Sequence, residues 1–375
     1  RGMQTDKITP FQFLVLVIFF TIGSSILYIP STLTTAVKQD AWIAAIIGNL
    51  LGLLVVWFFT TISLWFPKLT YTEVNEKIFG KLIGKLISIL FVLMAFLYAS
   101  ALIAQSSIFL ITQMYPETPI TFINLLMVLI VILAVRLGIQ TIARSAEIFL
   151  FFFLLLFMIL VVSISPQIQF ANLEPFFQAH ITSILNSSFK VTAVSSINAI
   201  VLFMIFPSFV SDIKKCRKNF YIGTLIGGAV IITITMLCIF VLGSNTTAHQ
   251  VYPSYTLAKV INVGDFITRI EGLMTLLWTL ALFFKVTLYF YTGVLALSKL
   301  LNIKEYRVLT FPAGAIILVF SIIIFPNILY QYKFDEEIAI AITFVIGLIF
   351  PLLATIVFQL RKKKLKKDPD YAKSN

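Results

Sequence analysis

The sequence predicts an all-α membrane protein with ten transmembrane helices, built as a 5+5 inverted repeat in which spans 1 and 6 are broken. Three observations predict this fold: the composition, ten long apolar runs, and interruptions by small and polar residues at matching places in the two halves. Of 375 residues, 59% are hydrophobic and 12% are charged, whereas a soluble domain carries roughly 25% charged residues. The chain is therefore expected in a lipid bilayer.

Ten apolar runs reach the length that a spanning helix needs, which is about 20 mainly apolar residues. They cover residues 10–37, 41–66, 83–114, 118–136, 145–165, 187–211, 218–243, 266–298, 307–325 and 336–360. We expect a single polytopic membrane domain over residues 1–360, with one repeat at about 10–165 and a second at about 187–360. Amphipathic helices outside the core are expected at 69–85, 172–185 and 252–266.

The positive charges predict the orientation. Most of the 28 Lys and Arg residues lie in the loops on the side of both termini and in the tail at 361–375. Cytoplasmic loops carry an excess of Lys and Arg, so both termini are expected in the cytoplasm. The basic cytoplasmic tail is expected to be disordered and to lie on anionic lipid. This pattern accounts for the net charge of +12 without a nucleic-acid partner.

The sequence offers little for catalysis or for metal binding. It has no Gly-rich phosphate loop and no HExxH motif, and its two histidines, His180 and His249, fall in loops expected outside the cell. Cys216 and Cys238 lie about 33 Å apart along one predicted helix, too far to form a disulfide. We therefore expect neither an enzyme nor a cofactor or metal site.

Span 1 is expected to be broken at "TIGSSILYIPSTL". Gly23 and the two serines that follow are weak helix formers, and Pro30 lacks a backbone N–H. Span 6 contains the matching stretch "SSINAIVLFMIFPSF", which begins at Ser195 and includes Pro207. Irregular backbone at membrane depth survives only where it is buried in protein or lines a cavity. In inverted-repeat transporters such broken helices hold the substrate near the midplane; two ordinary kinked helices are the alternative.

A lysine stands in the middle of the apolar stretch "TLALFFKVTLYFYTG" in span 8. Lys285 precedes Lys299 by 14 residues, about 21 Å of helix rise, so its amine is too deep to reach the membrane surface fully. All 16 acidic residues fall in predicted loops or span ends, so no carboxylate is expected at this depth. Either the amine is neutral, or it is charged and held by free backbone carbonyls. A structural role in a wet crevice is the alternative to a functional one.

Helical spacing assigns two faces to span 8. At 100° per residue, Lys285 shares a face with Tyr289, whereas Thr287 and Tyr291 point away from it. We expect the first face to hold the ion-like role and the second to line a ligand pocket. By the same spacing Tyr98, Leu102 and Gln105 form one stripe on span 3, although ordinary packing also explains aromatic residues in so apolar a chain.

Three stretches carry a resemblance to a known family. They are "ITPFQFLVLVIFFTIGSSILYIPS" (8–31), "EVNEKIFGKLIGKLI" (73–87) and "RLGIQTIARSAEIF" (136–149). The third is the most specific, through the spacing of Arg136, Gly138, Arg144 and Glu147. The chain resembles the B subunits of the GerA-type spore germinant receptors, which belong to the amino acid–polyamine–organocation superfamily. The resemblance extends from Ile8 to the basic tail.

This resemblance implies a leucine-transporter-like fold in the spore inner membrane, a small nutrient germinant such as an amino acid, and two partner subunits, a membrane A subunit and a lipid-anchored C subunit. In that fold span 3 faces the substrate, and transporters of the class often hold sodium between spans 1 and 8. The ammonium of Lys285, bonded to carbonyls near Gly23–Ile26, would replace that ion. The expected ligand-binding residues are Gly23, Ser24, Ser25, Ile26, Tyr98, Leu102, Gln105, Ser195, Ser196, Asn198, Thr287 and Tyr291.

Two functions remain open at this point. One is a ligand-sensing receptor subunit that triggers germination, and the other is a proton- or sodium-coupled amino acid transporter; both use the same fold and pocket. The stretch "RLGIQTIARSAE" has its own physical interpretation. Glu147 follows Arg144 by three residues, the separation at which side chains meet on a helix. This predicts a clamp in the cytoplasmic loop, with a partner contact or inner gate as the alternative.

Overall fold

The computed structural model describes residues 7–261, 271–365 and 368–371. Within these ranges the regular structure is helical, apart from one isolated bridge between Ile8 and Val210. Nine helical stretches of the described chain are long and apolar enough to cross a membrane, and Pro10–Ile22 adds a shorter apolar helix. One of the nine, Ser25–Ser63, joins the second half of span 1 to span 2. Counting these separately gives the ten predicted spans.

The helices of the first repeat follow the predicted order. They are α1 (Pro10–Ile22), α2 (Ser25–Val37), η1 (Lys38–Asp40), α3 (Ala41–Ser63), α4 (Tyr71–Phe79), α5 (Lys81–Gln113), α6 (Ile120–Leu137) and α7 (Ile139–Ile164). Two short helical turns, η2 (Ser165–Gln167) and η3 (Phe170–Leu173), lead to the second repeat.

The second repeat contains more short pieces. They are α8 (Ile181–Ser195), η4 (Ile197–Met204), α9 (Ile213–Leu242), α10 (Ser244–His249), α11 (Pro253–Lys259), α12 (Glu271–Leu300), η5 (Tyr306–Leu309), α13 (Thr310–Ile323), α14 (Ile328–Lys333), η6 (Phe334–Ile338), α15 (Ala339–Phe344), η7 (Val345–Ile349), α16 (Phe350–Leu360) and α17 (Lys362–Leu365). Residues 266–270, the predicted start of span 8, lie outside the described residues.

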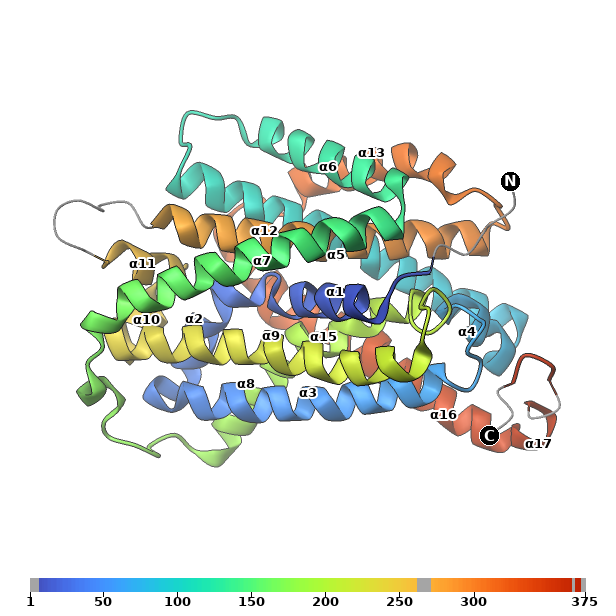
Figure 1. Cartoon of the computed structure of the whole chain (residues 1–375), viewed down its shortest axis with the longest axis horizontal. Coiled ribbons are helices and arrows are strands. Elements are labelled where there is room, and N and C mark those ends of the chain that lie inside the picture. Colours follow the sequence, from blue (N-terminus) through green and yellow to red (C-terminus); the bar gives the residue numbers. More distant parts are fainter. Residues whose placement is uncertain (1–6, 262–270, 366–367, 372–375) are drawn as a thin grey trace.

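The long helices run side by side in one bundle (Figure 1). Helix α12 packs on α5, α1 packs on α9, and α3 packs on both α8 and α9. The start of α1 lies with α4, α16 and α17 at one end, called here the α4 end, whereas α10 and α11 lie at the opposite end, the α10 end (Figure 1). Large apolar side chains such as Leu133, Phe151 and Ile323 are at least 59% exposed. Such a surface suits contact with lipid and confirms the membrane prediction.

Both predicted breaks are present. Helix α1 ends at Ile22, Gly23 adopts φ +20° and ψ −114°, and α2 starts at Ser25. Pro30, by contrast, lies inside α2 without ending it. Helix α8 ends at Ser195, and η4 continues the chain as a tighter 3₁₀ helix. The two interruptions therefore occupy corresponding places in the two repeats.

Several predicted boundaries differ from the structure. Span 6 begins at Ile181 and not at 187, and the helix expected over 172–185 is not formed as one piece, since residues 174–180 are not helical. Three further differences follow. Helix α7 begins at Ile139 and not at 145, because Gly138, at φ +93°, makes the turn from α6 within a single residue. The last span begins at Ile328 and not at 336. Its first turns, "ILYQYKFD", mix polar and aromatic residues, so a search for apolar runs excluded them. The third difference concerns the tail: α17 and residues 368–371 pack on the α4 end, so the prediction of a disordered tail is wrong for these residues.

Candidate ligand-binding site

A cavity of about 120 Å³ lies between the two helix breaks. Helices α2, α5, α8 and α12 contribute to its wall, together with the π-helical segment η6 and with α15. Single-turn π-helices inside longer helices are frequent at functional sites. Seven of the predicted site residues line this cavity: Ser24, Ser25, Tyr98, Leu102, Gln105, Asn198 and Lys285.

The predicted stripe of span 3 contacts span 10. The hydroxyl of Tyr98 lies 2.5 Å from the carbonyl oxygen of Ala339 and 2.8 Å from Oγ1 of Thr343. Thr343 in turn donates to Oδ1 of Asn198 at 2.8 Å. Gln105 donates from Nε2 to both carboxylate oxygens of Asp335, at 2.9 and 3.1 Å. These bonds fix α5, η4 and span 10 relative to one another around the cavity.

Lys285 bridges the two breaks. Its Nζ lies 3.2 Å from the carbonyl oxygen of Val194 in the last turn of α8 and 3.4 Å from Oγ of Ser24 between α1 and α2. It also lies 5.2 Å from the centroid of the Phe20 ring. The predicted partners were carbonyls of span 1 near Gly23–Ile26. The contact with span 1 is instead to a hydroxyl, and the carbonyl that the amine contacts belongs to span 6.

Gly23 leaves room for this lysine. A Cβ atom built on Gly23 would lie 2.2 Å from Cδ of Lys285, which is closer than atoms approach in proteins. The backbone of Gly23 also has φ +20°, a conformation that residues with a side chain rarely adopt. Gly23 therefore shapes the path of the Lys285 side chain without lining the cavity itself.

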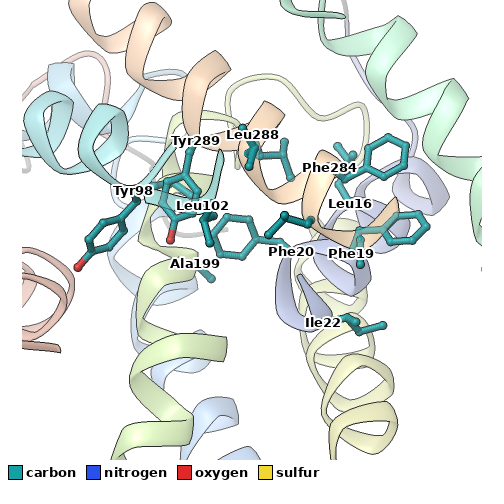
Figure 2. Close-up of a cluster of buried hydrophobic side chains, with 14 of the residues drawn as sticks. Leu16, Phe19, Phe20, Ile22, Tyr98, Leu102, Ala199, Phe284, Leu288 and Tyr289 are labelled. Atoms are coloured by element: carbon teal, nitrogen blue, oxygen red, sulfur yellow. The ribbon is translucent and has the colours of Figure 1, made fainter. Parts of the chain in front are cut away.

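Aromatic side chains surround the cavity on the α12 side. The rings of Tyr98 and Tyr289 meet edge to face at 5.6 Å between centroids, and Phe20 lies 5.2 Å from Tyr289. Figure 2 shows Tyr98, Tyr289 and Leu102 together at one side of this cluster, with Phe19 and Phe284 at the other. Among the described residues the hydroxyls of Tyr289 and Ser25 have no hydrogen-bond partner. Buried polar groups normally have one, so both are free for a ligand or a water molecule.

The predicted division of span 8 into an ion-like face and a separate ligand face is wrong. Tyr289 lines the cavity together with Lys285, whereas Thr287 and Tyr291 do not. Tyr291 packs instead against the ring of Tyr306 at 5.7 Å between centroids. The helical spacing was correct, but the amine and the ligand pocket share a face because the cavity lies directly beside the two breaks.

Four other predicted residues lie at the two helix breaks and do not line the cavity. Gly23 is the first of them. The carbonyl of Ile26 accepts a hydrogen bond from Oγ of Ser254 at 2.6 Å. Ser195 donates to the carbonyl of Val191 at 2.7 Å. Ser196 lies against Gly52: a Cβ atom built on Gly52 would lie 2.2 Å from Oγ of Ser196.

Two acidic residues line the cavity, contrary to the expectation that all carboxylates lie in loops or at span ends. Asp335 and Glu336 belong to η6, inside span 10. The error follows from placing the start of span 10 too late. Glu336 forms an ion pair with Lys190 of α8. Among the described residues neither acid forms an ion pair with Lys285, whose polar contacts are the two oxygens named above.

The predicted clamp between Arg144 and Glu147 is wrong; Arg136 and Arg307 hold this loop instead. Arg136 donates to the carbonyl of Arg307 at 3.3 Å, and Nε of Arg307 donates back to the carbonyl of Arg136 at 2.8 Å. Within the described chain no ion pair joins Arg144 to Glu147. Glu147 instead accepts a hydrogen bond from Nε2 of Gln12 in α1 at 3.3 Å. Because α7 starts early, Glu147 lies in the third turn of this helix and away from its N-terminus.

Two helices broken at matching positions around a central cavity define a class of membrane proteins, those of leucine-transporter-like fold. Solved structures agree. The chain resembles Mhp1, a nucleobase-cation-symport-1 family transporter with bromovinylhydantoin bound, with a TM-score of 0.67 and 12% identity over 100% of this chain and 83% of that one. It resembles MhsT in complex with L-phenylalanine with a TM-score of 0.68 and 14% identity over 97% and 92%. The predicted fold is confirmed.

Sequence comparison gives the family. Residues 7–329 match the family described as spore germination protein. The chain is 30% identical to spore germination protein KB of Bacillus subtilis (strain 168), over 97% of this chain and 98% of that protein. It is 22% identical to spore germination protein GerLB of Bacillus cereus, over 87% of each. The chain belongs to the spore germination protein family, and its resemblance to germinant receptor B subunits is confirmed.

Proposed function

We propose that this chain is the ligand-sensing transmembrane subunit of a nutrient germinant receptor in the spore inner membrane. It binds a small amino acid or similar nutrient in the cavity between the two helix breaks, and occupancy triggers germination together with an A and a C subunit. The observation that carries the proposal is this cavity, with unpartnered buried hydroxyls, in a member of the spore germination protein family. Neither the fold nor the family suggests an enzyme.

The cavity offers complementary groups to a zwitterion. Helix α2 starts at Ser25, and its first N–H groups and positive dipole end favour a carboxylate, as does the amine of Lys285. The carboxylate of Asp335 is available to an ammonium group. Tyr289 also lines the cavity, and its hydroxyl, which has no hydrogen-bond partner among the described residues, offers a further polar contact.

The orientation in the membrane is part of the proposal. We place the α4 end and both termini on the cytoplasmic side, the spore core, because the loops at this end carry most of the Lys and Arg residues. Residues 1–360 then form one membrane domain with repeats at about 10–165 and 187–360, and 361–375 form a basic cytoplasmic segment.

The mouth of the cavity faces the α10 end. The chain runs from α8 through η4 to Phe203, whose ring stacks on Tyr71 of α4, so Lys190 lies on the far side of the break from α4. The side chains of Lys190 and Glu336 are 37% and 33% exposed, whereas Lys285 is 1% exposed. We therefore place the entry route of the nutrient at this ion pair, which forms the exposed rim of the cavity.

Glu336→Gln is expected to shift the nutrient dose response of spores severalfold and to leave thermal stability almost unchanged. An ion pair with partners about one third exposed contributes at most about 1 kcal/mol to stability, but it must open for each binding event. The exchange of both charges, Lys190→Glu with Glu336→Lys, should restore the response. Lys215→Met, which removes the exposed pair with Asp212 at the α4 end, is the matched control. If Glu336→Gln leaves the dose response unchanged, the ion pair does not control entry of the nutrient.

The alternative function is coupled transport, which is favoured by the fold that this chain shares with Mhp1, a nucleobase-cation-symport-1 family transporter. Uptake of a labelled nutrient by purified protein in liposomes, with and without a proton or sodium gradient, separates the two. A receptor subunit should bind the nutrient that germinates spores carrying only this receptor and should show no gradient-driven uptake. Accumulation above that of empty liposomes would establish the transporter instead.

A further inference from the structure

The chain after α16 folds back onto α4. Arg361 donates from Nη1 to the carbonyl of Ile78 at 2.9 Å. Nζ of Lys77 lies 2.8 Å from Oδ2 of Asp368 and 2.9 Å from Oδ2 of Asp370. The hydrogen bonds that Lys77 donates to these two carboxylates raise its pKa, and the bond that Asp368 accepts from Lys77 lowers the pKa of Asp368. Two ion pairs and a hydrogen bond therefore join the segment after α16 to α4.

Apolar contacts support the same docking. Directly before this segment, Phe358 of α16 stacks on Trp65 at 3.9 Å between ring centroids. The ring of Tyr371 lies 6.0 Å from Phe358 and 5.9 Å from Phe66. Leu365 is buried in the same cluster. Residues 361–365 and 368–371 thus bind α4 and the end of α3 through ion pairs, a hydrogen bond and packed rings together.

Helix α4 covers the end of the broken span 6. The ring of Tyr71 stacks on Phe203 of η4 at 5.7 Å between centroids. A small void between α3, α4 and the end of η4 is lined by Ser63, Tyr71, Phe203 and Pro207, among others. Nζ of Lys299 donates to Oε1 of Glu73 at 3.1 Å, which ties α4 to the last turn of α12, the helix that carries Lys285.

We propose that the described residues of the C-terminal segment, 361–365 and 368–371, are a latch that holds α4 against η4 and α12 and keeps the α4 end of the bundle closed. In a transporter of this fold that end would open to release the substrate. With the latch docked, the α4 end stays closed and the nutrient enters past the Lys190–Glu336 pair, so ligand occupancy changes the conformation without passing material across. The significance of the latch for sensing depends on the proposed function, but its effect on access does not.

A thiol probe beneath α4 tests the latch without any ligand. Ser63 is 4% exposed and lines the void under α4. In a chain carrying Cys216→Ala and Cys238→Ala, we would place Ser63→Cys and measure its labelling by a membrane-impermeant maleimide in full-length protein in lipid nanodiscs. Deletion of 361–375 should increase the labelling rate about tenfold, since the loss of about 1.4 kcal/mol of closing free energy corresponds to that factor. An equal rate in the deleted and full-length chains would overturn the proposal.

Charge reversal keeps the test decisive if the deletion variant does not fold. Lys77→Glu should increase the labelling rate about threefold, in line with the modest strength of partly exposed ion pairs. The triple variant Lys77→Glu, Asp368→Lys, Asp370→Lys should return to the original rate. The matched control is Lys81→Glu, an exposed neighbour that forms no ion pair within the described residues. If the labelling rate of the triple variant stays as high as that of Lys77→Glu, the ion pairs of Lys77 with Asp368 and Asp370 do not hold the α4 end closed.

Discussion

Gly23→Val is expected to abolish the nutrient response of spores that rely on this receptor, while the protein remains in the membrane. The first Cβ atom would lie 2.2 Å from Cδ of Lys285, so the lysine must leave its place between the two breaks. The positive φ adds about 1–2 kcal/mol of strain for any residue with a side chain. Gly23→Ala should act in the same direction. The measurement is a germination dose response, with the membrane content of the protein determined in parallel.

Substitutions at two other glycines serve as controls that distinguish the clash with Lys285 from the backbone strain. Gly80 has φ +91° and, within the described chain, open space where a Cβ would stand, so Gly80→Ala carries strain alone. Gly272 has open space among the described residues and carries neither penalty, so Gly272→Ala should behave like the wild type. A Gly23→Val receptor with unchanged dose dependence would show that the break in span 1 does not form the pocket.

Lys285→Met is expected to destabilise the subunit and to leave the germination response either lost or constitutive. The substitution keeps the length of the side chain and removes the donor to the carbonyl of Val194 and to Ser24. A buried acceptor left without a partner costs about 1–3 kcal/mol. Thermal unfolding of the purified protein and germination with and without nutrient measure the two effects. Wild-type behaviour in both would reject a functional role for the amine.

The matched control is Lys304→Met, which removes an exposed lysine from the loop after α12 and should change neither property. A double-mutant cycle adds a sharper criterion. Because the clash at Gly23 involves the aliphatic part of Lys285, Gly23→Ala should cost less in a Lys285→Ala chain than in the wild type. Additive effects would mean that the two residues act independently.

The sequence was informative where local chemistry decides the structure. Glycine and adjacent serines located the breaks at Gly23–Ser25 and Ser195–Ser196 because these residues stabilise a helix poorly. The depth of Lys285 followed from helix rise alone. Its second partner, the carbonyl of Val194, could not be predicted, since it depends on how α8 packs beside α12, and hydropathy carries no information on such contacts.

Span 10 shows why part of the site was missed. Asp335 and Glu336 were assigned to the end of a span because charges mark the limits of apolar runs, yet the helix continues outward through "ILYQYKFD" and places both acids at the cavity. The sequence did contain a signal for this site, because Asp335 and Glu336 come just before a long apolar run. The tail was misjudged in the same way: its lysines suggested lipid, whereas Asp368, Asp370 and Tyr371 provide the contacts with α4.

Protection of a cavity thiol by a germinant tests most directly whether the cavity between the breaks is the nutrient site. Thr32 lines the cavity and is partly exposed, so Thr32→Cys, in a chain without Cys216 and Cys238, should react with a small thiol reagent. A nutrient identified by screening spores that carry only this receptor should slow that reaction, with the same midpoint concentration as the germination response. If the variant still germinates with this nutrient but its labelling rate does not change at saturating concentration, the nutrient binds elsewhere.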